Sequence, residues 1–232
     1  MPGLPIVFIP GLMVTGRIYE HQALELGQRH PVLFANHWSH GSMAEIARAI
    51  LAVAPSTFAL AGMSMGGYVA LEIMRRAPER VEKLVLMSTS AKPDTPERSE
   101  DRRKQVAAAK SAGNMRAWAK TLYPKLVRPA RHEDVPLLRE FIEMAEQLGV
   151  EAFARQIEAI IGRADSRPLL SEIKVPTLVV ASKDDTLITP DNSEEIARGV
   201  PDAKLELVEH CGHMGMIERP ETYTKLLTGF LR

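Results

Sequence analysis

The chain has 232 residues, 45% hydrophobic and 25% charged, which is typical of a single globular domain and excludes a disordered, fibrous or membrane-embedded protein. Its 29 basic and 29 acidic side chains balance, so we expect a small-molecule partner, no nucleic acid and no membrane. The single cysteine, Cys211, excludes an intramolecular disulfide and is compatible with the cytoplasmic location that we expect.

Short apolar runs along the chain predict the strands of a mostly parallel sheet. The first run lacks the basic start of a signal peptide and is interrupted by prolines, so we interpret it as a buried strand. Most runs are followed by helix-like segments, and this alternation predicts an α/β fold whose strands are buried on both faces. The six runs lie at 5–9, 31–35, 57–61, 83–88, 176–181 and 204–208.

Two amphipathic helices are expected between these strands. Apolar side chains recur at helical spacing between Met43 and Leu51, and again between Val69 and Met74. Pro78 predicts the end of the second helix, because proline cannot continue a helix interior. Each helix can therefore cover one face of the sheet.

The string Gly62-Met63-Ser64-Met65-Gly66, between the third strand and the second helix, matches the pattern G-x-S-x-G. So tight a turn forces Ser64 into strained backbone geometry, and the flanking glycines remove the Cβ atoms that would clash. The hydroxyl is pushed outward at a helix start, where free N–H groups favour negative charge. We interpret Ser64 as a nucleophile, against the alternative of a glycine-rich turn with a bystander serine.

The strand signal disappears over residues 92–170, which are helical, charged and punctuated by prolines. We expect a helical lid there, inserted into an α/β core of residues 1–91 and 171–232 within one structural domain. The first half of the lid is basic and the second half acidic. Mutual salt bridges between solvated helix faces are the favoured interpretation, and a basic entrance for an acidic substrate is the alternative. The basic residues are Arg102, Arg103, Lys104, Lys110, Arg116, Lys120, Lys125, Arg128 and Arg131.

A serine nucleophile needs a base and a group that orients the base. His213 lies in the loop after the last strand, which can swing over the serine, so it is the expected base. His210 is its rival but lacks the preceding glycine that Gly212 gives His213. Asp185 and Asp184 follow the penultimate strand and compete as the orienting acid, with Asp185 favoured by its position in the turn. The order Ser64, Asp185, His213 is the one that this strand layout requires. Surface or packing roles suffice for the other histidines, His21, His30, His37, His40 and His132.

The oxyanion formed during acyl transfer needs preorganised donors. We expect the N–H of Met65, which follows the nucleophile, and the N–H of Leu12, which follows the first strand. Gly11 lets the backbone approach the substrate, whereas Pro10 has no N–H to donate. No metal or cofactor is expected, because His210, Cys211 and His213 lack zinc-type spacing and a further convergent ligand.

These motifs resemble the α/β-hydrolase superfamily over nearly the whole chain. The elbow Gly62–Gly67 is similar to the G-x-S-M-G-G elbow of 3-oxoadipate enol-lactonases, small carboxylesterases and cofactor-free haloperoxidase-like hydrolases. Residues 77–86 and 211–221 resemble the same group's helix-to-strand passage and terminal histidine loop. Pro10 and Ser182 depart from the family's usual histidine and glycine. The chain begins at the family's third strand, so the resemblance implies about six strands.

The residues and the resemblance together predict a serine hydrolase that cleaves an ester, lactone or thioester of a small molecule through an acyl-enzyme. A C–C bond hydrolase or lyase with the same triad is one alternative, and a non-catalytic ligand-binding protein on a hydrolase fold is another. The lid is expected to shape the pocket. The expected lining residues are Gly11, Met63, Trp118, Tyr123 and Phe141.

Overall fold

The computed structural model describes residues 3–232. All six predicted strands form, and they pair in parallel throughout one sheet with the order β2-β1-β3-β4-β5-β6. Each lies within two residues of the predicted run. The strands are β1 (Ile6–Ile9), β2 (Val32–Phe34), β3 (Phe58–Met63), β4 (Val81–Met87), β5 (Thr177–Ser182) and β6 (Lys204–Val208).

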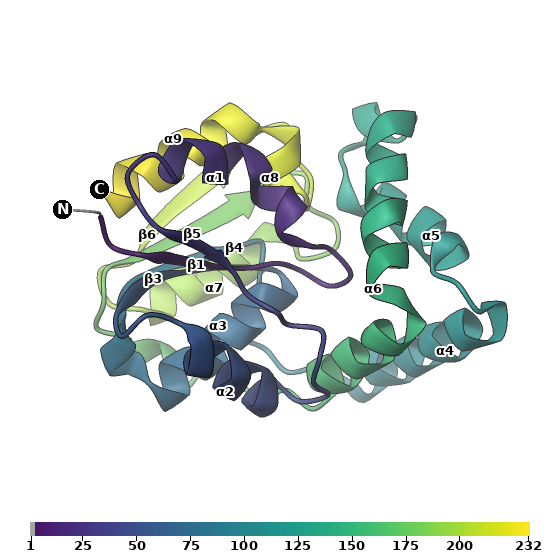
Figure 1. The fold of residues 1–232 in the computed structure, drawn as a ribbon, viewed down its shortest axis with the longest axis horizontal. Coiled ribbons are helices and arrows are strands. Elements are labelled where there is room, and N and C mark those ends of the chain that lie inside the picture. Colours follow the sequence, from purple (N-terminus) through teal and green to yellow (C-terminus); the bar gives the residue numbers. More distant parts are fainter. Residues whose placement is uncertain (1–2) are drawn as a thin grey trace.

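Helices cover both faces of the sheet (Figure 1). One face carries α1 (Glu20–Leu26), α8 (Gly215–Glu218) and α9 (Pro220–Leu231), and the other carries α2 (Met43–Val53), α3 (Met65–Arg76) and α7 (Pro190–Gly199). Short 3-10 turns, η1 (Gly16–Tyr19), η2 (Pro78–Arg80), η3 (Pro129–Arg131) and η4 (Leu170–Glu172), complete the connections. The two predicted helices correspond to α2 and α3, and α3 ends just before Pro78 as expected.

Burial on both faces holds for the central strands but not for the edges of the sheet. Every residue of β1, β3 and β5 is buried, whereas four of the five residues of β6 are exposed. Strand β2 is only partly buried. The prediction of uniform burial is therefore wrong at β2 and β6, because each has a neighbour on one side only.

The strand order creates a switch point beside β1. The chain passes from β1 outward to β2, then returns across β1 to β3, so helices α1 and α3 leave β1 and β3 toward opposite faces. Ligands of open α/β sheets bind in the crevice at the carboxyl ends of such a strand pair. Gly11 and Leu12 follow β1 there, and Ser64 follows β3.

The segment predicted as a lid, residues 92–170 and called the lid below, contains α4 (Pro96–Ala112), α5 (Arg116–Leu126) and α6 (Val135–Ile161), which stand together at one end of the sheet (Figure 1). Helix α6 is interrupted at Gly149, whose φ of 79° suits glycine. No helix in the described range 3–232 is both long and apolar enough to span a membrane.

The expected salt bridges between the two halves of the lid are largely missing. Within residues 3–232, one ion pair joins the basic half to the acidic half, between the near neighbours Arg131 and Asp134. The acidic side chains Glu140 and Glu143 of α6 instead lie 3.6 and 3.5 Å from Arg17 of η1. The salt-bridge part of the favoured interpretation is therefore wrong: among the described residues, no ion pair joins a basic side chain of α4 or α5 to α6. Most of these basic side chains are nevertheless exposed to solvent, as that interpretation expects.

The end of α5 is tied to the loop that carries His213. The N–H of Met214 donates to the carbonyl of Leu126 at 3.0 Å. The buried carboxylate of Glu218 accepts N–H groups from both segments, Gly212 at 2.8 Å and Arg128 at 3.1 Å. Burial raises the pKa of Glu218, although these N–H donors oppose the shift. The lid and the histidine loop are thus held together by main-chain contacts.

Candidate active site

Ser64 lies on the sharp turn between β3 and α3 that its flanking residues predict. Its φ of 54° and ψ of −117° fall in a strained region for a residue with a side chain. The turn is fixed because the N–H of Ser64 donates to Met87 at 3.0 Å and its carbonyl accepts the Thr89 hydroxyl at 2.7 Å. The surrounding fold therefore holds the Ser64 side chain at the carboxyl edge of the sheet.

Two glycines make this turn sterically possible. A Cβ atom on Gly62 would lie 2.3 Å from the carbonyl oxygen of Gly66, and one on Gly66 would lie 2.0 Å from the carbonyl oxygen of Ile9. Both contacts are with backbone, which cannot move aside as a flexible side chain would. The G-x-S-x-G pattern thus has a direct packing reason in this chain.

His213 and Asp185 form a buried pair. Nδ1 of His213 donates to Oδ2 of Asp185 at 2.7 Å, and both side chains are almost completely buried. The other carboxylate oxygen, Oδ1, accepts the N–H groups of Leu187 and Ile188, each at 2.9 Å. The carboxylate is therefore fixed by its own turn and in turn fixes the imidazole.

The rival residues lie elsewhere. Asp184 and His210 are exposed, and neither side chain reaches the His213–Asp185 pair. Cys211 is buried with its sulfur 3.3 Å from the Ser182 hydroxyl, and burial raises the pKa of its thiol to about 11. In the described range no cluster of three potential metal ligands occurs. The geometry thus favours Asp185 over Asp184 and His213 over His210.

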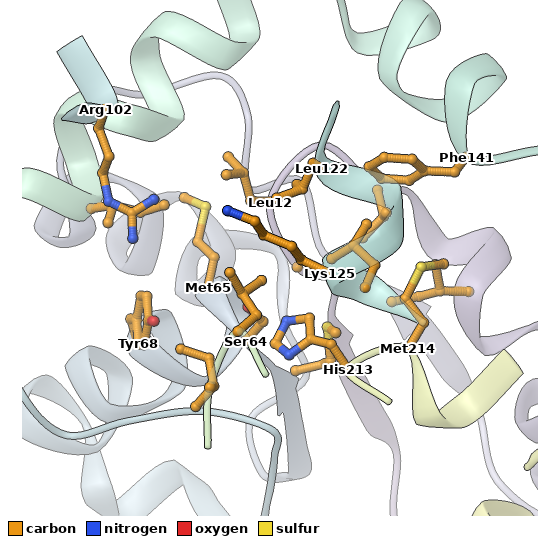
Figure 2. A pocket seen from close by; sticks show the side chains of 18 of the residues that line it. Leu12, Ser64, Met65, Tyr68, Arg102, Leu122, Lys125, Phe141, His213 and Met214 are labelled. Carbon is orange, nitrogen blue, oxygen red and sulfur yellow. The ribbon is translucent and has the colours of Figure 1, made fainter. Parts of the chain in front are cut away.

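Ser64 and His213 line one cavity of about 250 Å³, and Figure 2 shows the imidazole of His213 turned toward Ser64. The structure records no hydrogen bond between these two described side chains. Bonds of this kind are often long in a free enzyme and shorten when substrate binds. Ser64 and His213 thus share one cavity, and Asp185 lies directly behind His213.

The segment 10–14, which we call the oxyanion loop, lies beside Ser64. Gly11, Leu12, Ser64 and Met65 all line the cavity. Within residues 3–232, no acceptor is recorded for the N–H groups of Leu12 and Met65. The role of these two N–H groups as oxyanion donors stays a prediction.

His37 is a residue of this region that sequence reasoning missed. It follows β2, is fully buried, and its Nε2 donates to the carbonyl of Gly11 at 2.7 Å. That carbonyl belongs to the same peptide unit as the N–H of Leu12, and the two point in opposite directions in a trans peptide. His37 therefore orients the Leu12 N–H from behind. No local sequence signal indicates this contact, because it joins segments that meet only in the folded chain.

Gln156 of α6 holds the other side of the same loop. Its Oε1 accepts the N–H of Met13 at 3.2 Å, and both residues are buried. Met13 has a φ of 55°, which is unusual for a residue with a side chain. The oxyanion loop is thus fixed by one side chain from the sheet layer and one from the lid.

His37 predicts a specific pH dependence of stability. Burial lowers its pKa from 6.5 to about 4, against the opposing effects of its bonds to the backbone at Gly11 and Ala35. The unfolded chain therefore takes up the proton first as the pH falls. Stability that is complete above about pH 6.5 is lost toward pH 4, by about 3 kcal/mol in total.

We expect this loss to disappear in His37→Gln, which keeps a donor but does not titrate. Urea unfolding at pH 7 and pH 4 measures it, and the exposed His132→Gln serves as the control. An equal loss of stability in His37→Gln and the unmodified protein contradicts the assignment.

The expected lining residues are only partly brought together. Gly11, Met63, Trp118 and Phe141 line the cavity, and the rings of Trp118 and Phe141 are 5.9 Å apart. Tyr123 does not line it: its hydroxyl donates to the carbonyls of Arg131 and Asp134, so it packs inside the lid. The prediction for Tyr123 is wrong because the apolar side of α5 is divided between the cavity and the lid interior.

Comparisons with known proteins agree with this geometry. A family model described as the alpha/beta hydrolase family matches residues 6–226. A protein of Azorhizobium caulinodans that carries the name carbamate hydrolase RutD is 29% identical, over 98% of this chain and 91% of its own length.

Two solved structures are similar over almost the whole chain. A thermophilic esterase from Thermogutta terrifontis has a TM-score of 0.90 at 26% identity, covering 100% of this chain and 90% of its own. The enol-lactonase from Burkholderia xenovorans has a TM-score of 0.85 at 25% identity, with coverage of 99% and 92%. The α/β fold predicted from the sequence is confirmed by these neighbours.

Proposed function

The chain belongs to the alpha/beta hydrolase family and is a hydrolase, and from this premise we propose that it cleaves a carboxylic ester, lactone or thioester of a small molecule through an acyl-enzyme on Ser64. The observation that carries the proposal is the buried His213–Asp185 pair, which opens onto the same cavity as the strained Ser64. A serine hydroxyl is a poor nucleophile without such a base.

In the first half-reaction the Ser64 oxygen attacks the substrate carbonyl and His213 Nε2 takes up the serine proton. Asp185 holds Nδ1 of the same ring as the donor, which leaves Nε2 as the acceptor. The proton then passes from Nε2 to the leaving group as the carbon–oxygen or carbon–sulfur bond breaks. In the second half-reaction, His213 activates water, which releases the acyl group and regenerates Ser64.

The N–H groups of Leu12 and Met65 bind the oxyanion of each tetrahedral intermediate. Loss of one such donor in comparable sites costs roughly 10²- to 10³-fold in kcat. His37 is a positioning residue for the Leu12 donor, because its bond to Gly11 fixes the peptide plane and polarises the amide. Pro10, the residue before Gly11, has no polar side chain that could make this hydrogen bond, and His37 makes it instead.

The relatives support the reaction class without fixing the substrate. Their names include an esterase and an enol-lactonase, and both ester and lactone cleavage need the same attack on a carbonyl carbon. The carbamate hydrolase name of a further relative describes attack on a similar carbonyl group. An ester or lactone is therefore the first substrate class to test.

Labelling with a fluorophosphonate probe tests the proposal. The probe phosphonylates an activated serine, so we expect stoichiometric labelling of the unmodified protein, detected by intact-protein mass spectrometry. Labelling should be lost in Ser64→Ala and retained in Ser90→Ala. Ser90 is the control because it is a buried serine that donates to Asn192 and does not line the cavity. An inert unmodified protein, or labelling that survives Ser64→Ala, excludes Ser64 as the nucleophile.

A further inference from the structure

The cavity beside Ser64 has one polar wall. Most of its lining is apolar, with Leu12, Val14 and Ile18 from the core and Phe141 and Leu122 from the lid. The charged lining residues all come from α4 and the end of α5. They are Arg98, Asp101, Arg102 and Lys125.

These charges are not equally available to a ligand. Nε of Arg102 lies 2.6 Å from Oδ2 of Asp94. The other carboxylate oxygen, Oδ1, lies 2.9 Å from the Arg163 guanidinium. Although burial opposes it, these two guanidinium groups lower the pKa of Asp94, which remains a carboxylate bound to Arg102. Arg102 is therefore already engaged.

Lys125 is different. In the described part of the chain no carboxylate lies within ion-pair distance of its ammonium group, nor of the Arg98 guanidinium. Figure 2 shows the Lys125 side chain extending into the cavity, over the space that Ser64 and His213 face. Lys125 and Arg98 outnumber Asp101, so this wall carries a net positive charge.

The backbone fixes Lys125 relative to the catalytic histidine. It immediately precedes Leu126, whose carbonyl accepts the N–H of Met214, the residue after His213. Glu218 joins the same two segments a second time. These contacts anchor the backbone beside Lys125 to the histidine loop, and the exposed Lys125 side chain lines the same cavity as Ser64 and His213.

We propose that Lys125 binds a carboxylate at the end of the substrate remote from the scissile carbonyl, so that the preferred substrates are mono-esters or lactones that carry a free acid. This rests on the proposed function of Ser64. A compact ammonium without a protein partner, at the edge of an otherwise apolar cavity, gains a charge-assisted hydrogen bond when an anion enters. The apolar lining then contacts the methylene groups between the two ends.

Lys125 lies in the last turn of α5, where a positive charge also stabilises the helix dipole. If Lys125 only stabilised the helix, its loss would lower the turnover of all substrates equally. If Lys125 binds a carboxylate, its loss lowers the turnover of acidic substrates alone. The informative measurement is therefore the ratio of two kcat/KM values, one for an acidic ester and one for its neutral counterpart.

The experiment compares monomethyl esters of linear dicarboxylic acids with methyl esters of the matching fatty acids, for example monomethyl adipate with methyl hexanoate. A series of acyl-chain lengths identifies the preferred length. Methanol release gives kcat/KM for the unmodified protein, Lys125→Gln, Lys125→Arg and Lys120→Gln. Lys120 is the matched control, because it is exposed on the same helix and does not line the cavity.

We expect the acid-to-neutral ratio at the preferred length to fall about tenfold in Lys125→Gln, equivalent to about 1.4 kcal/mol. Lys125→Arg should retain most of the ratio, and Lys120→Gln all of it. An unchanged ratio in Lys125→Gln overturns the inference and leaves the proposed function intact. Turnover that survives Ser64→Ala overturns the proposed function instead.

Binding to the inactive protein decides the role of Lys125 independently of turnover. Calorimetry with the Ser64→Ala protein should show monomethyl adipate bound about tenfold more weakly once Lys125→Gln is added. Binding that does not depend on Lys125, or no binding at all, contradicts the inference.

Discussion

Replacing His213 by alanine is expected to lower kcat for ester hydrolysis by about 10⁵- to 10⁶-fold. Without the imidazole, no group near Ser64 can take its proton during attack or protonate the leaving group. Residual activity then depends only on the oxyanion donors and substrate binding. Steady-state kinetics with an activated ester measure the loss. The enzyme must first be purified free of esterases from the expression host.

The control for this experiment is His210→Ala. His210 lies three residues earlier in the same loop but is exposed. Among residues 3–232, its one recorded hydrogen bond is made by its carbonyl, which accepts from Arg219. We expect its kcat to remain within about twofold of the unmodified enzyme. A small effect at His213 together with a large one at His210 reverses the assignment of the base.

The second large effect is expected for Asp185→Asn, which should lower kcat by about 10⁴-fold. The side-chain oxygen of asparagine can still accept the N–H groups of Leu187 and Ile188, as Oδ1 does now. Its NH₂ group then faces Nδ1 of His213, which must become an acceptor. Nε2 carries the proton in that tautomer and can no longer act as a base.

Asp184→Asn is the matched control for Asp185→Asn, because Asp184 is the neighbouring residue and its side chain is exposed. It should retain full activity. Circular dichroism and urea unfolding of both variants separate a catalytic loss from a folding defect. The assignment of the orienting acid is wrong when Asp184→Asn loses activity and Asp185→Asn does not.

The sequence predicts the central sheet well because strand formation here has a local signal. Residues 58–61 and 178–181 are continuous apolar runs, and β3 and β5 are buried on both faces. The edges are less predictable, because an apolar run does not tell which strands have one neighbour. In β6, Leu205 and Leu207 are apolar and yet about 40% exposed, a consequence of strand order alone.

The residues of the candidate site likewise divide into those that the sequence predicts and those that it does not. Ser64 has a dense local signature in its glycines, and the positions of Asp185 and His213 follow from the loops after later strands. His37 could not be recognised, because its function depends on a contact with Gly11 across the fold. Whether a basic residue of the lid is paired is likewise a tertiary property. It distinguishes Arg102, which binds Asp94, from Lys125.

The tie between α5 and the loop around Met214 has a consequence for protein synthesis. Ser64 precedes His213 by 149 residues in the chain, and the whole lid lies between them. At about 5–20 residues per second, synthesis of this stretch lasts roughly 7 to 30 s. During it the nascent chain has a nucleophile without a base and a lid without its anchor. Hydrolytic competence therefore arises in one late step, when the last strand joins the sheet and delivers the imidazole and the anchor together.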